Sequence, residues 1–329
     1  MHAGYVEALK ELGQQVATFH LGDRLDFYSA ACFEISRGPD GQSQFRRALD
    51  DEQAKYLAAN GLLSACYQFW PDVVLIVSAF YVPVDMMDLL RSRGHRVVLI
   101  HTEVPYENDR QVERAAHADL NLVTDPTGID AFRAVAPTYY LPQAYRPSLH
   151  CPGPALPELE CDFTMVGTGY GSRVEFMEAM DLDGLDVVLA GNWTQLREDS
   201  PLYPFVAHAT AECLDNERAV DLYRSAKVGI NLYRREADRP ELSSGWACGP
   251  REIEQAACGL FFLRDPRPEG DELFPMLPTF GSSQEASELL RWYLAHEIQR
   301  EEAAALARKA VVDRTFVNHA RSLLRLLGQ

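Results

Sequence analysis

The sequence predicts an α/β protein of two doubly wound domains, each with a parallel β-sheet covered by helices on both faces. Short apolar runs rich in β-branched residues alternate with amphipathic stretches of helical spacing, which is typical of βαβ units. A proline-rich segment divides this alternation into two halves. The length of 329 residues agrees with two domains, because a domain has about 150 residues.

The first half contains five runs with the composition of strands. The chain opens in a helical stretch, residues 4–12, which Gly13 is expected to end. The predicted strands are 16–19, 73–77, 97–101, 120–124 and 139–141, and the helices that join them include 84–93 and 111–117. A doubly wound domain normally opens with a central strand, so we expect the missing first strand to be encoded upstream of Met1. The N-terminal domain is predicted to span residues 1–145.

Prolines mark the end of this domain. They are Pro142, Pro147, Pro152, Pro154 and Pro157. Each proline fixes φ and removes a backbone N–H donor, so neither a helix nor a central strand can continue through them. Residues 146–160 are therefore predicted to be the linker between the two domains.

The alternation then resumes in a second predicted domain, residues 161–310. Its predicted strands are 163–166, 187–190, 228–232 and 260–263, and its predicted helices are 173–180, 219–226 and 251–257. Apolar residues at helical spacing predict two further helices, 284–308 and 315–327. We expect the last segment, residues 311–329, to pack back across the domains.

Composition and charge limit the function. The chain has 31 Lys and Arg against 48 Asp and Glu, a net charge of -17, which disfavours binding to nucleic acids or anionic membranes. The longest apolar run, residues 73–84, is shorter than the roughly 18 to 20 residues of a membrane span. The polar N-terminus does not resemble an export signal. We therefore expect a cytoplasmic protein, in the host cytoplasm if the gene belongs to a phage.

Cysteine and histidine spacing predicts neither disulfides nor a metal centre. The seven cysteines form no C-x-x-C pair, and their odd number argues against a disulfide framework. The tight spacings of Cys and His that structural zinc sites use are missing. We expect reduced cysteines and no bound metal.

A glycine-rich turn, residues 167–173, follows a predicted strand and opens a predicted helix. Its backbone amides and the helix N-terminus could hold a phosphate, although a plain glycine-rich turn has the same composition. The run does not complete G-x-G-x-x-G, because the last position is Ser172, and no acid follows the next strand to bind an NAD ribose. Arg173 could neutralise a diphosphate, or it could be a solvated surface arginine.

The segment 243–259 is the most informative part of the chain. Pro250 suits the first position of a helix, which would place Arg251 and Glu254 one turn apart on one face. A carboxylate there could accept both hydroxyls of a ribose, while Arg251 and the amides of residues 243–245 would attract phosphates. The alternative is an ion pair at the start of a helix, stabilised by the helix dipole.

This segment resembles the R-x-x-E-x-x-x-x-G signature of the spore-maturation-type (CgeB-like) glycosyltransferases, a GT-B family of bacteria, including actinobacteria, and their phages. The resemblance covers essentially the whole chain and is stronger after residue 98. Further similar segments are 101–107, 121–126, 166–173, 189–193, 222–232, 293–296 and 314–319.

The resemblance implies a GT-B fold, in which two Rossmann-like domains face a central cleft and the second domain binds a nucleotide-sugar as co-substrate, without a cofactor. The implied donor-binding residues are Gly167, Thr168, Gly169, Tyr170, Arg173, Asn192, Ser243, Ser244, Gly245, Arg251 and Glu254. His101 and Glu103 are the implied catalytic residues, on the side of the sugar or the acceptor. Fixed dipoles and arginines can stabilise the leaving diphosphate without a metal. We expect transfer with retention, and a protein is one expected class of acceptor.

One position departs from the related retaining enzymes. They have a second glutamate eight residues before the ribose glutamate, where this chain has Trp246. The carboxylate that would contact the sugar is thus unassigned, and Ser243 and Ser244 are candidate replacements. Three alternatives therefore stay open: a non-catalytic GT-B scaffold that binds a nucleotide-sugar or a partner protein, an NAD-dependent enzyme, and a sugar epimerase.

Two other patterns can be explained without a binding or catalytic role. Asp181 and Asp183 imitate the D-x-D motif of metal-using GT-A enzymes, but they lie in a turn before a strand and are expected to be solvated. Arg234, Arg235 and Arg239 follow a predicted strand, and they form either a patch that steers anions or an ion-paired loop.

Overall fold

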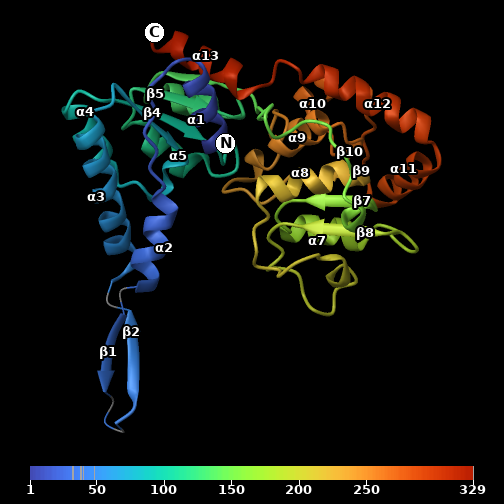
Figure 1. Ribbon diagram of the computed structural model, residues 1–329, viewed down its shortest axis with the longest axis horizontal. Coiled ribbons are helices and arrows are strands. Elements are labelled where there is room, and N and C mark those ends of the chain that lie inside the picture. Colours follow the sequence, from blue (N-terminus) through green and yellow to red (C-terminus); the bar gives the residue numbers. More distant parts are fainter. Residues whose placement is uncertain (32, 38, 40, 48, 329) are drawn as a thin grey trace. The chain divides into compact units, whose positions relative to one another are not determined.

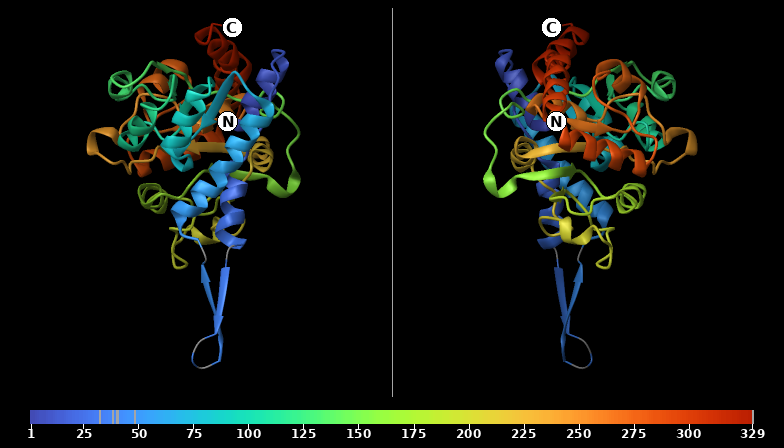
Figure 2. Two further views of the ribbon diagram at one scale, coloured as in Figure 1. Left: turned by 90° about the vertical axis from the view of Figure 1, so that its left-hand side faces the viewer. Right: turned by 90° about the vertical axis from the view of Figure 1, so that its right-hand side faces the viewer.

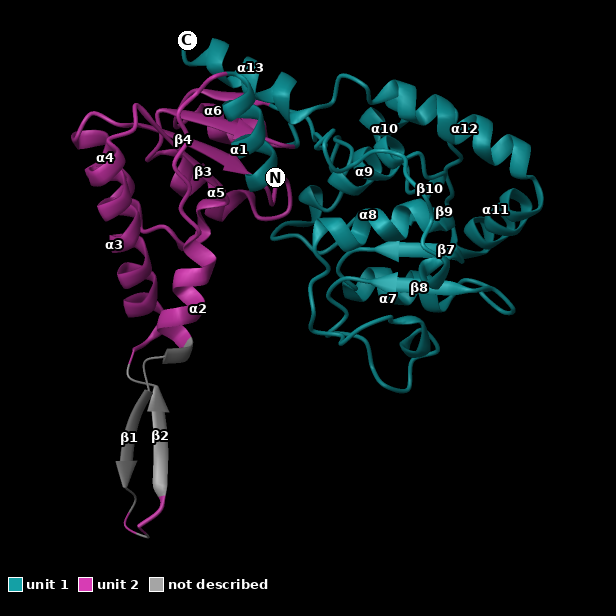
Figure 3. Cartoon of the chain, viewed as in Figure 1, with its two compact units in different colours: residues 1–12, 125–127, 141–329 teal, residues 13–124, 128–140 magenta. Residues whose placement is uncertain are grey.

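The computed structural model describes residues 1–31, 33–37, 39, 41–47 and 49–328. The chain divides into two compact units, coloured separately in Figure 3. Unit 1 comprises residues 1–12, 125–127 and 141–329, and unit 2 comprises residues 13–124 and 128–140. The last of the junctions between the units lies at residues 140–141, whereas the sequence suggests a boundary at 145–146.

Unit 2 contains a parallel sheet whose strand order, β3-β4-β5-β6, follows the sequence (Figure 1). The strands are β3 (Val73–Val77), β4 (Arg96–His101), β5 (Leu120–Val123) and β6 (Thr138–Tyr140). The helices are α2 (Leu21–Ala31), α3 (Asp51–Phe69), η1 (Ala79–Tyr81), α4 (Val84–Ser92), α5 (Asn108–Ala115) and α6 (Ile129–Arg133). Four of the five predicted strands are confirmed. They are apolar runs, and a parallel sheet covered on both faces buries such runs.

The predicted strand at residues 16–19 is wrong, because residues 14–20 have no regular structure. Phe19 packs instead beside Gly61 of α3 and joins the hydrophobic core of unit 2. Its apolar side chain is thus partly buried without a strand partner. The structure also contains an antiparallel hairpin, β1 (Phe33–Arg37) and β2 (Ser43–Arg47), which the sequence analysis does not predict.

Unit 1 contains a parallel sheet with the order β10-β9-β7-β8 (Figure 1). Its strands are β7 (Cys161–Val166), β8 (Val187–Ala190), β9 (Ala226–Asn231) and β10 (Phe262–Arg264). The helices between these strands are α7 (Gly171–Glu178), α8 (Asn216–Ser225) and α9 (Pro250–Cys258), and short 3-10 turns are η2 (Pro157–Leu159), η3 (Tyr203–Phe205) and η4 (Pro240–Leu242). The strands are buried almost continuously, as expected for a parallel sheet covered on both faces.

The strand order of unit 1 reverses between β7 and β9. The chain moves from β7 to β8 in one direction and then crosses back over β7 to reach β9. Right-handed crossovers in opposite directions place α7 and α8 on opposite faces of the sheet, and α9 packs on α8. The helices that follow β7 and β9 thus leave to opposite faces, which defines a topological switch point.

The C-terminal region contains more helices than predicted. They are α10 (Pro268–Leu273), α11 (Ser283–Ala295), α12 (Glu297–Ala310) and α13 (Phe316–Leu326). The single helix predicted over residues 284–308 is wrong, because His296 adopts φ -122° and ψ 71° and separates α11 from α12. The ring of His296 stacks on Trp292, with 3.9 Å between the ring centroids.

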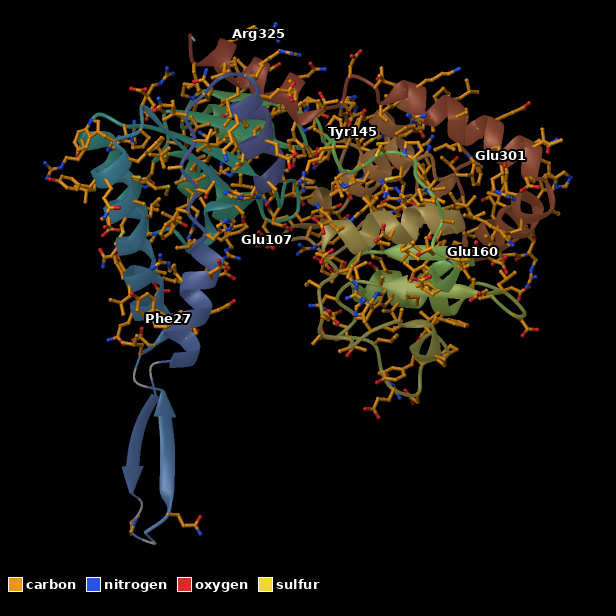
Figure 4. All side chains as sticks on the ribbon, viewed as in Figure 1. Phe27, Glu107, Tyr145, Glu160, Glu301 and Arg325 are labelled. Atoms are coloured by element: carbon orange, nitrogen blue, oxygen red, sulfur yellow. The ribbon has the colours of Figure 1, made fainter. Side chains whose placement is uncertain are left out.

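Segments from both ends of the chain complete unit 1. The helix α1 (His2–Glu11) packs beside α13 (Figures 1 and 2). Gly4 lies under the ring of Phe316, where a side chain would not fit. Tyr145, labelled in Figure 4, donates its N–H to the Arg314 carbonyl and accepts the N–H of Phe316. Among the described residues, no helix is both long enough and apolar enough to cross a membrane.

Candidate functional site

A cavity of about 180 Å³ lies in unit 1, among residues that follow the carboxyl ends of β7, β9 and β10. Its lining residues are Ser172, Arg173, Phe176, Leu232, Tyr233, Arg235, Asp265, Phe280 and Gly281. Open α/β sheets bind ligands outside the carboxyl ends of their strands, at the switch point. The cavity combines aromatic and aliphatic walls with two arginines and one aspartate, so it suits a ligand that has both an apolar part and polar groups.

An ion pair lies on the wall of this cavity. The Arg235 guanidinium donates to both carboxylate oxygens of Asp265 at 2.7 Å, and the Tyr233 N–H donates to the same carboxylate at 3.2 Å. Burial raises the pKa of Asp265, and the nearby Arg235 opposes this shift. Arg235 therefore belongs to an ion-paired loop, one of the two interpretations of the arginine cluster.

The glycine-rich turn uses most of its amides within the protein. The N–H groups of Gly167, Gly169 and Tyr170 donate to the carbonyls of Ala190, Asn192 and Thr168, at 2.8 to 2.9 Å. These three N–H groups have protein acceptors, so they do not form a ready cradle for a phosphate. The Asn192 side chain accepts from Thr194 and closes its own turn.

Two arginines flank the ring of Tyr170, which directly precedes α7. Arg173 donates to the Thr168 carbonyl at 2.9 Å, and its guanidinium carbon lies 5.2 Å from the centroid of the Tyr170 ring. The guanidinium carbon of Arg234 lies 5.0 Å from the same centroid. Arg173 thus lies in the first turn of α7 and on the cavity wall.

The loop before α9 binds carboxylates through four consecutive amides. The N–H groups of Trp246 and Ala247 donate to Asp125 Oδ2 at 3.0 and 2.9 Å. The next two N–H groups, of residues 248 and 249, donate to Glu269 and Glu252 at 2.7 Å. Such a run of amides is an anion-binding arrangement, and here the protein's own carboxylates occupy it.

Gly245 and its neighbours are tightly placed around this loop. A Cβ on Gly245 would lie 2.3 Å from Asp125 Oδ2 and 2.2 Å from a guanidinium nitrogen of Arg267, so only glycine fits there. Arg267 is buried, and it donates to Asp125 at 3.2 Å. Ser243 donates its hydroxyl to the Pro240 carbonyl, and Ser244 is exposed. Asp125 thus binds the two amides that follow the predicted phosphate-binding residues 243–245.

Helix α9 begins where the sequence predicts. Pro250 is its first residue, and Arg251 and Glu254 face the same side, joined by a hydrogen bond of 2.8 Å. The other carboxylate oxygen of Glu254 lies 3.8 Å from Nε2 of His150. Glu254 and the nearby Tyr223 are both buried. The one-turn spacing is confirmed, and the pair is already formed without a ligand.

The two candidates in unit 2 have different surroundings. His101 ends β4 and is buried, with Nε2 at 2.8 Å from Oδ1 of Asn121 and the Phe132 ring 5.0 Å away. Burial lowers the pKa of His101 to about 4, so the ring is neutral at pH 7. Glu103 is half-buried, and its backbone opens the turn that leads to α5.

The sequence analysis missed three acidic residues of the site. Asp265 directly follows β10 and lies two residues after the end of the strand predicted over residues 260–263, so its place near a strand end was a usable signal. Asp125 lies within a segment of recognised similarity, but its partners are about 120 residues away along the chain and leave no local pattern. Glu236 follows β9 in an irregular loop, and no sequence signal distinguishes it.

The remaining motifs have structural explanations. Asp181 accepts from Arg291 at the surface, as expected for a solvated turn. The described cysteines are free, and Cys32 lies outside the described residues. No group of three or more His, Cys, Asp or Glu side chains in the described part of the chain could hold a metal ion.

Comparison with known families gives one match. Residues 173–325 match the family model described as "Glycosyl transferase-like". The match begins in α7, and it includes Arg173, Arg251 and Glu254. A comparison with curated proteins found no significant match.

Several solved structures share the fold. Sucrose-phosphate synthase from Thermosynechococcus elongatus has a TM-score of 0.59 at 13% identity, over 89% of this chain and 82% of that chain. The structure described as trehalose-6-phosphate from E. coli bound with UDP-2-fluoro glucose has a TM-score of 0.60 at 12% identity, over 99% and 95%. Anabaena HepE in complex with UDP-glucose has a TM-score of 0.58 at 10% identity, over 82% and 82%. The chain thus has the GT-B fold, and its C-terminal part is glycosyltransferase-like.

Proposed function

We propose that this protein is a glycosyltransferase that takes a sugar from a nucleotide-sugar donor bound in unit 1. The observation that carries the proposal is the cavity at the switch point, where Arg173 and Arg235 stand beside apolar walls. The glycosyltransferase-like match covers the same part of the chain. Two of the similar structures hold UDP-sugars, which supports a nucleotide-sugar as the ligand class.

The proposed donor contacts follow from charge. Arg173 would bind the diphosphate, assisted by the N-terminus of α7. Glu254 would accept the ribose hydroxyls, exchanging part of its contact with Arg251 for them. In the reaction, the bond between the anomeric carbon and the donor phosphate oxygen breaks, and the acceptor oxygen bonds to that carbon while it loses its proton. Arginines and helix dipoles would stabilise the leaving diphosphate without a metal.

The finer parts of the proposal concern stereochemistry and acceptor. We propose transfer with retention by an enzyme of the spore-maturation type, in the cytoplasm, with a protein as one acceptor class. The net charge of -17 disfavours nucleic acid as acceptor. His101 and Glu103 remain the proposed catalytic residues, and the partial exposure of Glu103 makes it the better placed of the two to meet a substrate.

The proposal is tested by calorimetric titration with UDP-, GDP-, ADP- and TDP-sugars and with NADH. We expect one nucleotide-sugar to bind, and we expect Arg173→Ala and Glu254→Gln to weaken that binding at least tenfold. Arg197→Ala is the matched control, because Arg197 is an exposed arginine of unit 1 paired only at the surface with Asp199. Binding of NADH alone would contradict the proposal.

Turnover separates an enzyme from a scaffold. With the donor identified, release of the nucleoside diphosphate is followed with candidate acceptors, in the presence and absence of EDTA. We expect release that depends on the acceptor and is unchanged by EDTA. Donor binding without turnover on any acceptor class would favour the non-catalytic scaffold, whose motivation is Trp246. Isomerised donor without an acceptor would favour an epimerase.

A further inference from the structure

Glu236 joins the two loops that border the switch point. Its Oε1 accepts the backbone N–H of Ser172 at 2.9 Å, and its Oε2 accepts the N–H of Arg235 at 3.1 Å. Ser172 is the second residue of α7, after β7, and Arg235 follows β9 (Figure 1). Both partners line the cavity. One carboxylate therefore lies beside the cavity, at the carboxyl ends of β7 and β9.

The position of this carboxylate favours an anion. The N-terminus of a helix carries partial positive charge and N–H groups that lack partners within the helix, and α7 is long enough to have this property. Burial raises the pKa of Glu236, but the hydrogen bonds from Ser172 and Arg235 outweigh burial, so its pKa lies below the ordinary value. Glu236 is thus a carboxylate at neutral pH, held where α7 would attract another anion.

Two further positive groups lie close to this position. Arg173 lines the cavity next to Ser172, and the guanidinium groups of Arg173 and Arg234 both lie near the ring of Tyr170. The two contacts of Glu236 described above both come from backbone N–H groups. Glu236 is half-buried in a loop, so its side chain can leave without unfolding a strand or helix. A diphosphate brings more charge and more acceptor oxygens to the same groups.

We infer that Glu236 holds the place of a donor phosphate in the ligand-free chain and is displaced when a diphosphate binds. The inference rests on the proposed function and deepens it, because it identifies a residue that sets donor affinity. The exchange keeps the N-terminus of α7 bound to an anion in both states. A ligand without phosphates does not compete for the Ser172 N–H, so Glu236 lowers the affinity for diphosphates and leaves the affinity for such ligands unchanged.

The test measures the dissociation constants of inorganic pyrophosphate, UDP and uridine by calorimetry on the full chain. Pyrophosphate is included because its binding does not depend on the identity of the donor base. The variants are Glu236→Gln, which removes the charge but keeps an acceptor for Ser172, and Glu236→Ala, which removes both. The control is Glu241→Gln, because Glu241 is an exposed acid of the same loop, 3.8 Å from Arg239. Circular dichroism checks that each variant is folded.

We expect both Glu236 variants to bind pyrophosphate and UDP at least tenfold more tightly than the wild type, which corresponds to about 1.4 kcal/mol. Uridine binding and the Glu241→Gln variant should be unchanged. If the wild type binds UDP and the Glu236 variants bind it equally or more weakly, the inference is overturned while the proposed function stands. If neither the wild type nor any variant binds pyrophosphate or a nucleoside diphosphate, the proposed function fails, and this inference fails with it.

Discussion

Gly169 lies directly against the indole ring of Trp193, so that a Cβ on Gly169 would stand 2.4 Å from Cε3 of the ring. Trp193 is fully buried, and the N–H of Gly169 donates to the carbonyl of the preceding residue, Asn192. The loops that follow β7 and β8 can thus pack closely together because Gly169 has no side chain. This glycine is explained by packing, independently of any phosphate.

Replacing Gly169 by Ala should therefore destabilise unit 1. Overpacking of a closed site typically costs about 1–3 kcal/mol, and we expect that loss in the free energy of unfolding, measured by urea denaturation. The control is Gly171→Ala, because a Cβ there would meet its nearest neighbour at an ordinary 3.8 Å. Equal stability of the two variants would contradict this account of Gly169.

Replacing Asp125 by Asn should destabilise the loop before α9. Asp125 and Arg267 form a buried ion pair, and removing one charge of such a pair typically costs about 3–5 kcal/mol because the other stays buried. Urea denaturation measures the loss. Asp162→Asn is the matched control, because Asp162 pairs with Lys227 at the surface, where a pair contributes about 0–1 kcal/mol. A similar loss of unfolding free energy in both variants would show that the buried Asp125 pair stabilises the chain no more than a surface pair.

The buried Glu252 should make stability depend on pH. Burial raises the pKa of Glu252 from 4.5 to about 7, and its hydrogen bonds from Tyr233 and Gly249 oppose the rise. The folded chain keeps the proton up to about pH 7, whereas the unfolded chain loses it near pH 4.5. The free energy of unfolding should thus fall as the pH rises between these values, by up to about 1.4 kcal/mol per pH unit.

The variant Glu252→Gln isolates this effect, because it cannot titrate and still offers an acceptor to Gly249. Denaturation curves at several pH values should show the difference between wild type and variant changing from pH 4.5 to 7 and constant above pH 7. A difference that does not change with pH would mean that the carboxylate is ionised in the folded chain at all these values.

His101 should resist protonation. Its pKa is lowered from 6.5 to about 4 by burial, although the hydrogen bond to Asn121 opposes that shift. The unfolded chain takes up the proton first, so the unfolding free energy of unit 2 should fall as the pH is lowered from 6.5 to about 4. NMR titration of the ring should show it neutral at pH 5. A midpoint near 6.5 would instead show an accessible ring and would strengthen its proposed catalytic role.

Local signals predicted much of this protein. Pro250 begins α9, as its position in the sequence predicts. Short apolar runs of the sequence form the buried parallel strands, such as β7. The errors occurred where tertiary contacts decide the conformation. Phe19 packs beside α3 and does not form a strand. The apolar spacing over residues 284–308 suits a single helix, but the chain breaks at His296, whose ring stacks on Trp292.

The candidate site was predicted only in part, because some of its contacts are local in sequence and others are not. Arg251 and Glu254 are one helical turn apart, so their spacing shows that they meet. The contact of Asp125 with the Trp246 amide joins residues far apart in sequence, so it cannot be predicted from the spacing of residues along one helix or strand. Carboxylates that bind backbone amides are especially hard to predict, because every residue except proline offers the same N–H group.

The packing of α1 on α13 has a consequence for biosynthesis. The ribosome makes α1 (His2–Glu11) long before α13 (Phe316–Leu326), and chain growth proceeds at about 5–20 residues per second. The nascent α1 must therefore wait many seconds for the helix that covers Tyr5, whose ring meets Phe316 edge to face at 5.2 Å. The residues of unit 2 are all made before α13, so unit 2 can fold during synthesis, whereas unit 1 can close only after α13 has left the exit tunnel. During that interval Tyr5 lacks the ring that packs against it in the folded chain.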